Sequence, residues 1–175
     1  MNNVTKLLLL ILFNIAFLLA NEIQVSNVVL TNQNTTESTV DIQFDISWEN
    51  SWNVSSAPSN HDAAWVFVKF QDSDDAWYHA TLSSTNGDHT PASGTTIDAV
   101  GDGTGVFVYR SSTGTGTFNS TGNLIQWNYG DDGLFDSDQI TLKVFAVEMV
   151  YIPEGSFYVG ADTTNAGDVN PLYIV

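Results

Sequence analysis

The sequence predicts an all-β fold in which antiparallel strands pack as a β-sandwich. Apolar and polar residues alternate with a period of two along several segments from Ile23 onward. Clusters of Asn, Asp, Gly, Ser and Thr separate these segments, as turns separate the strands of antiparallel sheets. Almost no helical periodicity follows the first 21 residues. A closed barrel is the alternative arrangement of the same strands.

Residues 1–21 are predicted to be a secretory signal peptide. Lys6 supplies the positive charge that precedes the apolar region, and residues 7–19 are apolar apart from Asn14. This run is about 13 residues long, whereas a membrane-spanning helix needs roughly 20. Ala20 is a small residue at the predicted cleavage point, although Leu18 is bulky for the minus-three position, so a retained anchor is the alternative. The signal predicts a secreted or cell-surface protein.

The clearest strand is predicted at residues 40–48, VDIQFDISW. Its apolar residues share one face, and Asp41, Gln43, Asp45 and Ser47 share the other. Successive side chains of a strand point to opposite sides, so this pattern fits a strand with one buried and one wet face. The residues expected to be buried are Val40, Ile42, Phe44, Ile46 and Trp48.

Further strands are predicted on both sides of this segment. Residues 63–70, AAWVFVKF, are apolar on both faces, which is typical of a strand in the centre of a sheet. The turn QDSDDA joins them to residues 77–82 and predicts a hairpin. The remaining predicted strands are 23–30, 95–100, 105–110, 124–129 and 138–149, whereas TGTGT at 113–117 is expected to be a loop.

About eight antiparallel strands at this spacing favour a sandwich similar in plan to immunoglobulin or fibronectin III modules. Residues 22–148 are long enough to form one domain with its own core. The five tryptophans are expected to pack in that core or on a sheet face. An exposed aromatic platform for sugars is the alternative. These residues are Trp48, Trp52, Trp65, Trp77 and Trp127.

Composition excludes several kinds of chemistry. The chain has no cysteine, which rules out disulfides, thiolate zinc sites and cysteine nucleophiles within it. Beyond the predicted signal, Lys69, Arg110 and Lys143 are the basic residues, against 20 acidic ones. So acidic a surface disfavours nucleic acids and anionic membranes as partners, whereas a protein or glycan partner stays open. Solubility explains the acidity more simply than bound cations do.

Two acidic loops are the first candidates for a site, at Asp72–Asp75 and Asp131–Asp138. Calcium takes six to eight oxygen ligands, which clustered carboxylates in a turn can provide. Neither loop has the spacing of the helix–loop–helix calcium motif, so solvated turn residues are the preferred interpretation.

No other motif indicates catalysis. His61, His79 and His89 do not form a pair at metal-ligand spacing, and no nucleophile elbow is present. His61 and His89 are expected in polar loops, and His79 in a strand. The glycines of GDGTG at 101–105 lead into a strand rather than a helix, which favours a hairpin or bulge over a phosphate-binding loop. We therefore predict no catalytic, cofactor-binding or metal-ligating residue.

Residues 149–160, MVYIPEGSFYVG, resemble the opening of the formylglycine-generating-enzyme family, also called the sulfatase-modifying-factor family. Val150 and Ile152 are expected to form a short strand, Pro153 and Gly155 a tight turn, and Phe157 the beginning of the next strand. Glu154 and Val159 depart from the family's usual glycine and methionine. Residues 45–70, DISWENSWNVSSAPSNHDAAWVFVKF, also look like a module that precedes this domain in exported bacterial proteins.

The resemblance implies that residues 149–175 are the start of a larger domain related to C-type lectins. Enzymes of the family oxidise a sulfatase cysteine by means of a copper-binding cysteine pair, and other members are binding proteins. No catalytic residue is carried over to this chain, which lacks cysteine. The expected function is a non-catalytic, exported sandwich that supports or targets this downstream domain. The alternatives are a surface binding or adhesion module, for glycan or with calcium, and a self-assembling surface subunit.

Overall fold

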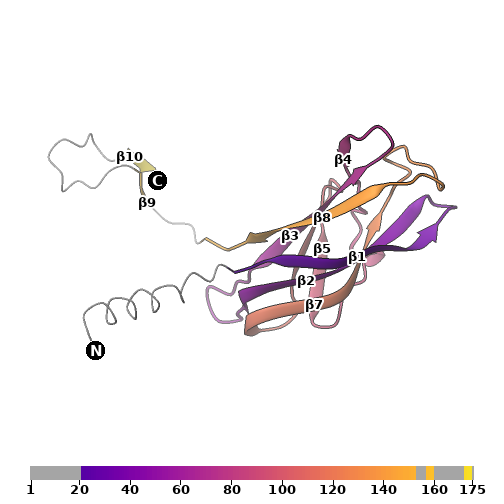
Figure 1. The fold of residues 1–175 in the computed structure, drawn as a ribbon. Helices are drawn as coiled ribbons and strands as arrows, with labels where there is room; N and C mark the ends of the chain where they lie inside the picture. The colour runs from indigo at the N-terminus through magenta and orange to yellow at the C-terminus, as the bar shows by residue number, and fades with distance from the viewer. Residues whose placement is uncertain (1–20, 153–156, 160–171, 175) are drawn as a thin grey trace, which may run out of the picture.

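A computed structural model describes residues 21–152, 157–159 and 172–174 of the 175-residue chain (Figure 1). The signal predicted at residues 1–21 lies outside the described residues, apart from Asn21. The prediction of an all-β fold with antiparallel strands is confirmed, because every strand pair is antiparallel.

The first sheet has three strands, in the order β1 (Gln24–Asn34), β2 (Thr39–Asn53) and β7 (Gly114–Trp127). In β2, buried residues alternate with half-buried ones from Val40 to Trp48, as the sequence pattern predicts. The strand extends to Asn53, five residues beyond the predicted end. We call these three strands the β2 sheet.

Strand β1 forms an edge of the β2 sheet and is irregular at two places. Its register against β2 shifts between Ser26 and Val29 and again after Thr31. Asn27 and Asn32 have positive φ angles there, and their side-chain amides donate to Asp45 and Asp41 of β2 at 2.6 and 2.9 Å. Bulges of this kind make an edge strand a poor template for pairing with another chain.

The second sheet has β3 (Ala63–Gln71) at its centre, as the sequence predicts. One edge of β3 pairs along its whole length with β8 (Thr141–Met149). The other edge pairs with β6 (Val106–Arg110) at its start and with β4 (Trp77–His79) at its end, and β5 (Thr95–Ala99) lies beyond β6. We call these five strands the β3 sheet.

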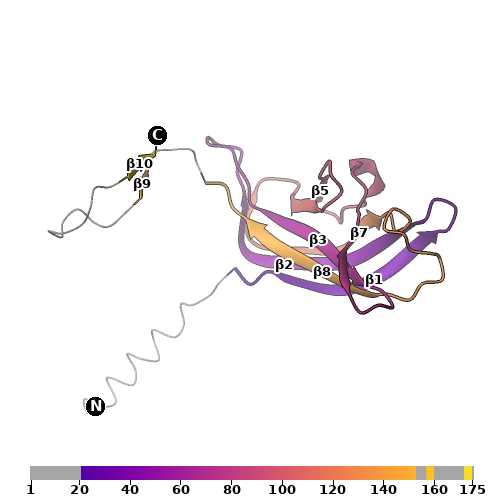
Figure 2. The same ribbon diagram turned by 90° about the horizontal axis from the view of Figure 1, so that it is seen from above.

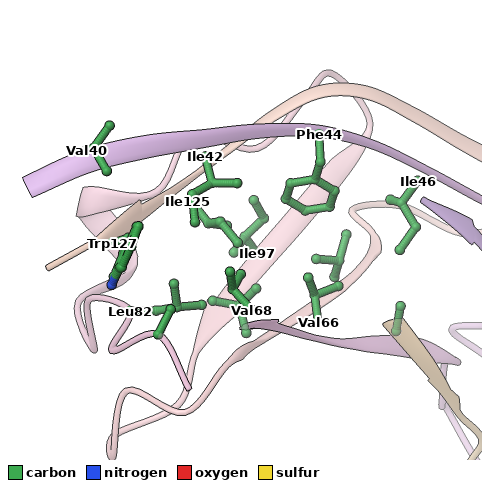
Figure 3. Close-up of a cluster of buried hydrophobic side chains, with 14 of the residues drawn as sticks. Val40, Ile42, Phe44, Ile46, Val66, Val68, Leu82, Ile97, Ile125 and Trp127 are labelled. Atoms are coloured by element: carbon green, nitrogen blue, oxygen red, sulfur yellow. The ribbon is translucent and has the colours of Figure 1, made fainter. Parts of the chain in front are cut away.

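The two sheets pack face to face around one hydrophobic core, with β3 and β8 in one layer and β1 and β2 in the other (Figure 2). Phe44 and Ile46 point from β2 towards Val66 and Val68 of β3 (Figure 3). The indoles of Trp48 and Trp127 are also buried. Burial of a large apolar side chain stabilises the fold by roughly 1.5–3 kcal/mol. The core lies within residues 40–129, inside the predicted domain.

Strand β7 corrects the prediction at its N-terminal half. The segment TGTGT at 113–117 was expected to be a loop, but residues from Gly114 onward pair with the end of β2, including Gly116 with Ser51. Most side chains between Gly114 and Gly122 are exposed, because this half lies at a sheet edge where little packs against it. The sequence therefore shows no alternation of apolar and polar residues in this half, and the strand could not be predicted from it.

The C-terminal hairpin also differs from the prediction. Residues 150–152 follow β8 without forming a strand, so the short strand expected at Val150 and Ile152 is wrong. Strand β9 (Phe157–Val159) pairs instead with β10 (Leu172–Ile174). The expected turn at Pro153 and Gly155 lies outside the described residues.

Candidate functional site

The side of the β3 sheet that points away from the core carries exposed apolar side chains, and we call it the outer face. In β3 the even-numbered residues are buried and the odd-numbered ones are half-buried, apart from Ala63. The register with β8 places Phe145, Val147 and Met149 on the same side, with 41–49% of each side chain exposed. When only one side of a sheet packs on the core, its other side usually carries polar residues, so apolar side chains on the outer face are unusual.

Aromatic rings contact one another across four strands of the outer face. Trp65 of β3 packs against Phe107 of β6, with ring centroids 5.1 Å apart. Phe67 stacks on Phe145 of β8 at 5.1 Å and lies parallel to His79 of β4 at 5.9 Å. These contacts fix the rings, because aromatic pairs add specific geometry to their burial. The predicted position of Trp65 on a sheet face is confirmed.

Two lysines lie at the end of the outer face that is nearest to β4. Lys69 and Lys143 are directly opposite each other in the register of β3 and β8. The Lys143 ammonium lies 4.5 Å from the ring centroid of Trp77, which is exposed to solvent. A cation over an indole face is attracted by the electron-rich ring. Trp77 is therefore a surface residue rather than part of the core.

The opposite end of the outer face is hollowed. A cavity of about 480 Å³ lies where the chain leaves β8, between the start of β3, the end of β6 and the loop before β3. We call it the β8 hollow. Its lining residues are Pro58, Ser59, Asn60, His61, Ala63, Asp98, Phe107, Tyr109, Met149, Val150 and Tyr151.

Hydrogen bonds and ring contacts hold the polar side of the β8 hollow in place. His61 stacks on Tyr109 with centroids 4.3 Å apart, and the Tyr109 hydroxyl donates to Asp98 at 2.6 Å. Partial burial, together with this bond, raises the pKa of Tyr109 to about 12. The indole N–H of Trp52 donates to the side-chain oxygen of Asn60 at 2.8 Å, so the NH₂ group of Asn60 points away from Trp52.

A second hollow of about 350 Å³ lies between β1 and residues 134–140, at the other end of the sandwich. Its polar groups are bonded to one another. The Tyr129 hydroxyl donates to Asp136 at 2.8 Å, and Gln33 donates to the backbone oxygen of Asp136 at 3.3 Å. These bonds tie β1 to the loop and give the second hollow a structural role.

The first acidic loop uses its carboxylates to form the turn between β3 and β4. Asp72 accepts a hydrogen bond from the backbone of Asp74, and Asp74 accepts bonds from the backbone of Ala76 and the hydroxyl of Tyr78. The bond from Tyr78 is the main cause that lowers the pKa of Asp74. The loop forms the predicted hairpin, with Asx turns as its local cause.

The second acidic loop is tied to the core. Asp132 accepts hydrogen bonds from the indole of Trp127 at 2.6 Å and from the backbone and hydroxyl of Thr81 at 2.9 and 2.6 Å. Asp138 accepts a bond from the backbone of Phe135. Within the described ranges, no three acidic or histidine side chains gather where they could hold a metal ion.

The three histidines lie in different surroundings. His79 is in β4, as predicted, and His61 lies beside the β8 hollow. His89 lies in a loop, as predicted, and it is buried, with 5% of its surface exposed. Its ring accepts a hydrogen bond from the backbone of Gln126, which draws the loop onto β7.

Sequence reasoning did not find the outer face or the β8 hollow as a site. The available signal was AAWVFVKF at residues 63–70, whose apolar residues on both faces predicted a strand in the centre of a sheet. The structure covers one side only, at least among the residues it describes. The hollow joins residues from four segments, and a single sequence does not show which segments become neighbours.

None of the helical segments in the described ranges is long and apolar enough to cross a membrane. Comparisons with family models, with curated proteins and with solved structures found no match to this chain.

Proposed function

We propose that this chain is an exported, non-catalytic β-sandwich module, similar in plan to immunoglobulin and fibronectin III domains, that supports a neighbouring domain. The neighbouring domain is of the formylglycine-generating-enzyme family, because residues 149–160 resemble the opening sequence of that family. The observation that carries the proposal is a continuous run of exposed apolar side chains. The run starts on the outer face and continues along the chain into residues 149–152, which open the stretch that carries the resemblance.

The run has two parts. Phe145, Val147 and Met149 project from β8, and Val150, Tyr151 and Ile152 follow with 50–80% of each side chain exposed. Large contiguous apolar patches are rare on monomeric proteins and mark interaction sites. A domain that begins directly after β8 is tethered beside this patch, so its effective concentration there is high. Packing of that domain against Phe145, Val147 and Ile152, which do not line the β8 hollow, would remove these three side chains from water.

The first test is to read the gene beyond Val175. The proposal expects an open frame that encodes the rest of a domain of this family. An in-frame stop codon directly after Val175 would refute it.

The second test is calorimetry on the protein that the whole gene encodes. We expect the sandwich and its neighbour to unfold in one transition, and the double variant Val147→Ser/Ile152→Ser to show two, because the contact is weakened. Val29→Ser is the matched control, since Val29 and Val147 are each 49% exposed but Val29 lies on β1 of the other sheet. Two separate transitions in the unmodified protein would contradict the proposed support.

A further inference from the structure

We propose that the β8 hollow binds sugar units of a neutral polysaccharide. This site is additional to the proposed support of a neighbouring domain. It rests on three features that occur together: aromatic rings on its walls, fixed hydrogen-bonding groups beside them, and a charge balance that suits an uncharged ligand.

The aromatic walls suit the apolar side of a sugar ring. Phe107, Tyr109 and Tyr151 line the hollow together with the imidazole of His61. Aromatic faces are electron-rich, so they attract the weakly positive C–H groups on the flat side of a pyranose. The stacking of His61 on Tyr109 and the tilted contact of Trp65 with Phe107 hold these rings in place before any ligand arrives. Such preorganisation reduces the entropic cost of binding.

The polar groups suit the hydroxyls around the edge of the sugar. Asp98 accepts the Tyr109 hydroxyl at 2.6 Å, and the two oxygens of a carboxylate have room for further donors. Asn60 directs its NH₂ group away from Trp52 and can donate to a sugar oxygen. Ser59 also lines the hollow and can both donate and accept. A purely apolar ligand would cover the remaining hydrogen-bonding capacity of these groups without supplying new partners, which is costly.

The charge of the site selects against anionic sugars. With histidine neutral, Asp98 is the one charged residue among those that line the hollow in the described part of the chain. The whole chain has a net charge of −16 at pH 7. Lys69 and Lys143 lie at the opposite end of the outer face, beside β4. Carboxylated or sulfated glycans would therefore be repelled at the hollow.

The experiment is a titration of the full chain with oligosaccharides, followed by tryptophan fluorescence and isothermal calorimetry. Trp65 contacts Phe107 of the hollow, so its emission reports binding. The neutral probes are the hexamers of cellulose, laminarin, mannan and amylose, and the anionic probe is oligogalacturonate. We expect at least one neutral hexamer to bind and oligogalacturonate not to bind.

Variants locate the site. His61→Ala and Asp98→Ala should each weaken binding about tenfold or more, because each removes one kind of contact. Trp77→Ala is the control, since it removes an exposed aromatic residue at the other end of the outer face and should leave binding unchanged. Circular dichroism melts confirm that each variant is folded.

Three outcomes would overturn the proposal: no neutral hexamer binds, only oligogalacturonate binds, or Trp77→Ala abolishes binding while the hollow variants retain it. The Val147→Ser/Ile152→Ser variant should keep its sugar affinity. The sugar site and the support of a neighbouring domain can therefore fail independently.

Discussion

The backbone N–H of Gln126 donates a hydrogen bond to Nδ1 of His89 at 3.1 Å, and Nε2 of the same ring lies 3.0 Å from the carbonyl oxygen of Ser83. Nδ1 must be the acceptor here, so the proton sits on Nε2 and is donated to Ser83. The ring is thus held in one neutral tautomer between the 83–90 loop and β7. Protonation at Nδ1 would break the bond to Gln126.

This geometry predicts that the protein loses stability in mild acid. Burial is the main cause that lowers the pKa of His89 below its usual 6.5, although the Ser83 carbonyl and the charges of Asp88 and Asp41 oppose it. A depressed pKa means that the unfolded chain takes up the proton first as the pH falls. The stabilisation that neutral His89 provides is complete above about pH 6.5, and it is lost as the pH falls towards the lower pKa that His89 has in the folded protein.

Urea unfolding between pH 7.5 and 5 measures this effect, which can reach about 1.4 kcal/mol per pH unit for one proton. The variant His89→Gln can accept from Gln126 and donate to Ser83 without titrating, so its profile should be flatter. His61→Gln is the control, because His61 is exposed. Equal pH dependence in the His89 variant and the unmodified protein would contradict the prediction.

The second prediction concerns the carboxylate of Asp62, which no solvent reaches. It accepts bonds from the indole of Trp48 at 2.5 Å, the hydroxyl of Ser51 at 3.0 Å and the backbone of Trp52 at 2.9 Å. Asp62→Ala removes the acceptor for all three donors at once. We expect the free energy of unfolding to fall by roughly 3 kcal/mol or more, because each buried unpaired donor is costly.

Chemical denaturation of Asp62→Ala, compared with Asp131→Ala, tests this expectation. Asp131 is an exposed acid, so its removal should change stability by about 0.5 kcal/mol at most. A companion variant, Asp132→Ala, should also destabilise the fold, since Asp132 accepts the indole of the second buried tryptophan, Trp127. Similar stability for the Asp62 and Asp131 variants would show that the buried acceptor is dispensable.

The sequence predicts the strands well where one side is buried and the other is wet. The segment 40–48 shows this pattern because β2 packs on the core with one face only. The same logic fails at 113–117, where Gly116 and its neighbours pair with β2 but have little to pack against. Their strand conformation depends on pairing with β2, and the sequence of residues 113–117 alone does not indicate that pairing.

The third prediction uses two glycines of the segment GDGTG that differ in their surroundings. A Cβ atom added at Gly105 would lie 2.7 Å from the indole of Trp65 and 2.7 Å from the carbonyl oxygen of Val66. Gly105→Ala should therefore push β6 away from β3 and destabilise the fold by about 1–3 kcal/mol. Gly101→Ala is the control, because nothing lies within 4 Å of its added Cβ. Thermal melts of both variants check the difference, and equal melting temperatures would contradict it.

The candidate site was harder to predict than the fold. The prediction of no catalytic or metal-ligating residue rested on motif spacing along the chain, whereas the β8 hollow assembles Asn60, Asp98, Tyr109 and Tyr151 from separate segments. The bond between Asp98 and Tyr109 joins β5 to β6, so it depends on the register of that hairpin. Register follows from the packing of both sheets, which periodicity within one segment does not specify.

The fourth prediction is a loss of stability in alkali that depends on Tyr109. Partial burial and the bond to Asp98 raise the pKa of its hydroxyl from 10.0 to about 12. Because the folded protein holds this proton more tightly than the unfolded chain, the stabilising effect is complete below about pH 10 and is lost as the pH rises towards 12. Tyr109→Phe has no proton to lose, so its stability should decline less between pH 9.5 and 11.5. Urea unfolding of both proteins in that range measures the difference, with Tyr151→Phe as the control, since Tyr151 is half exposed. If the Tyr109 variant declined as steeply as the unmodified protein, the hydroxyl would not be held by Asp98 in solution.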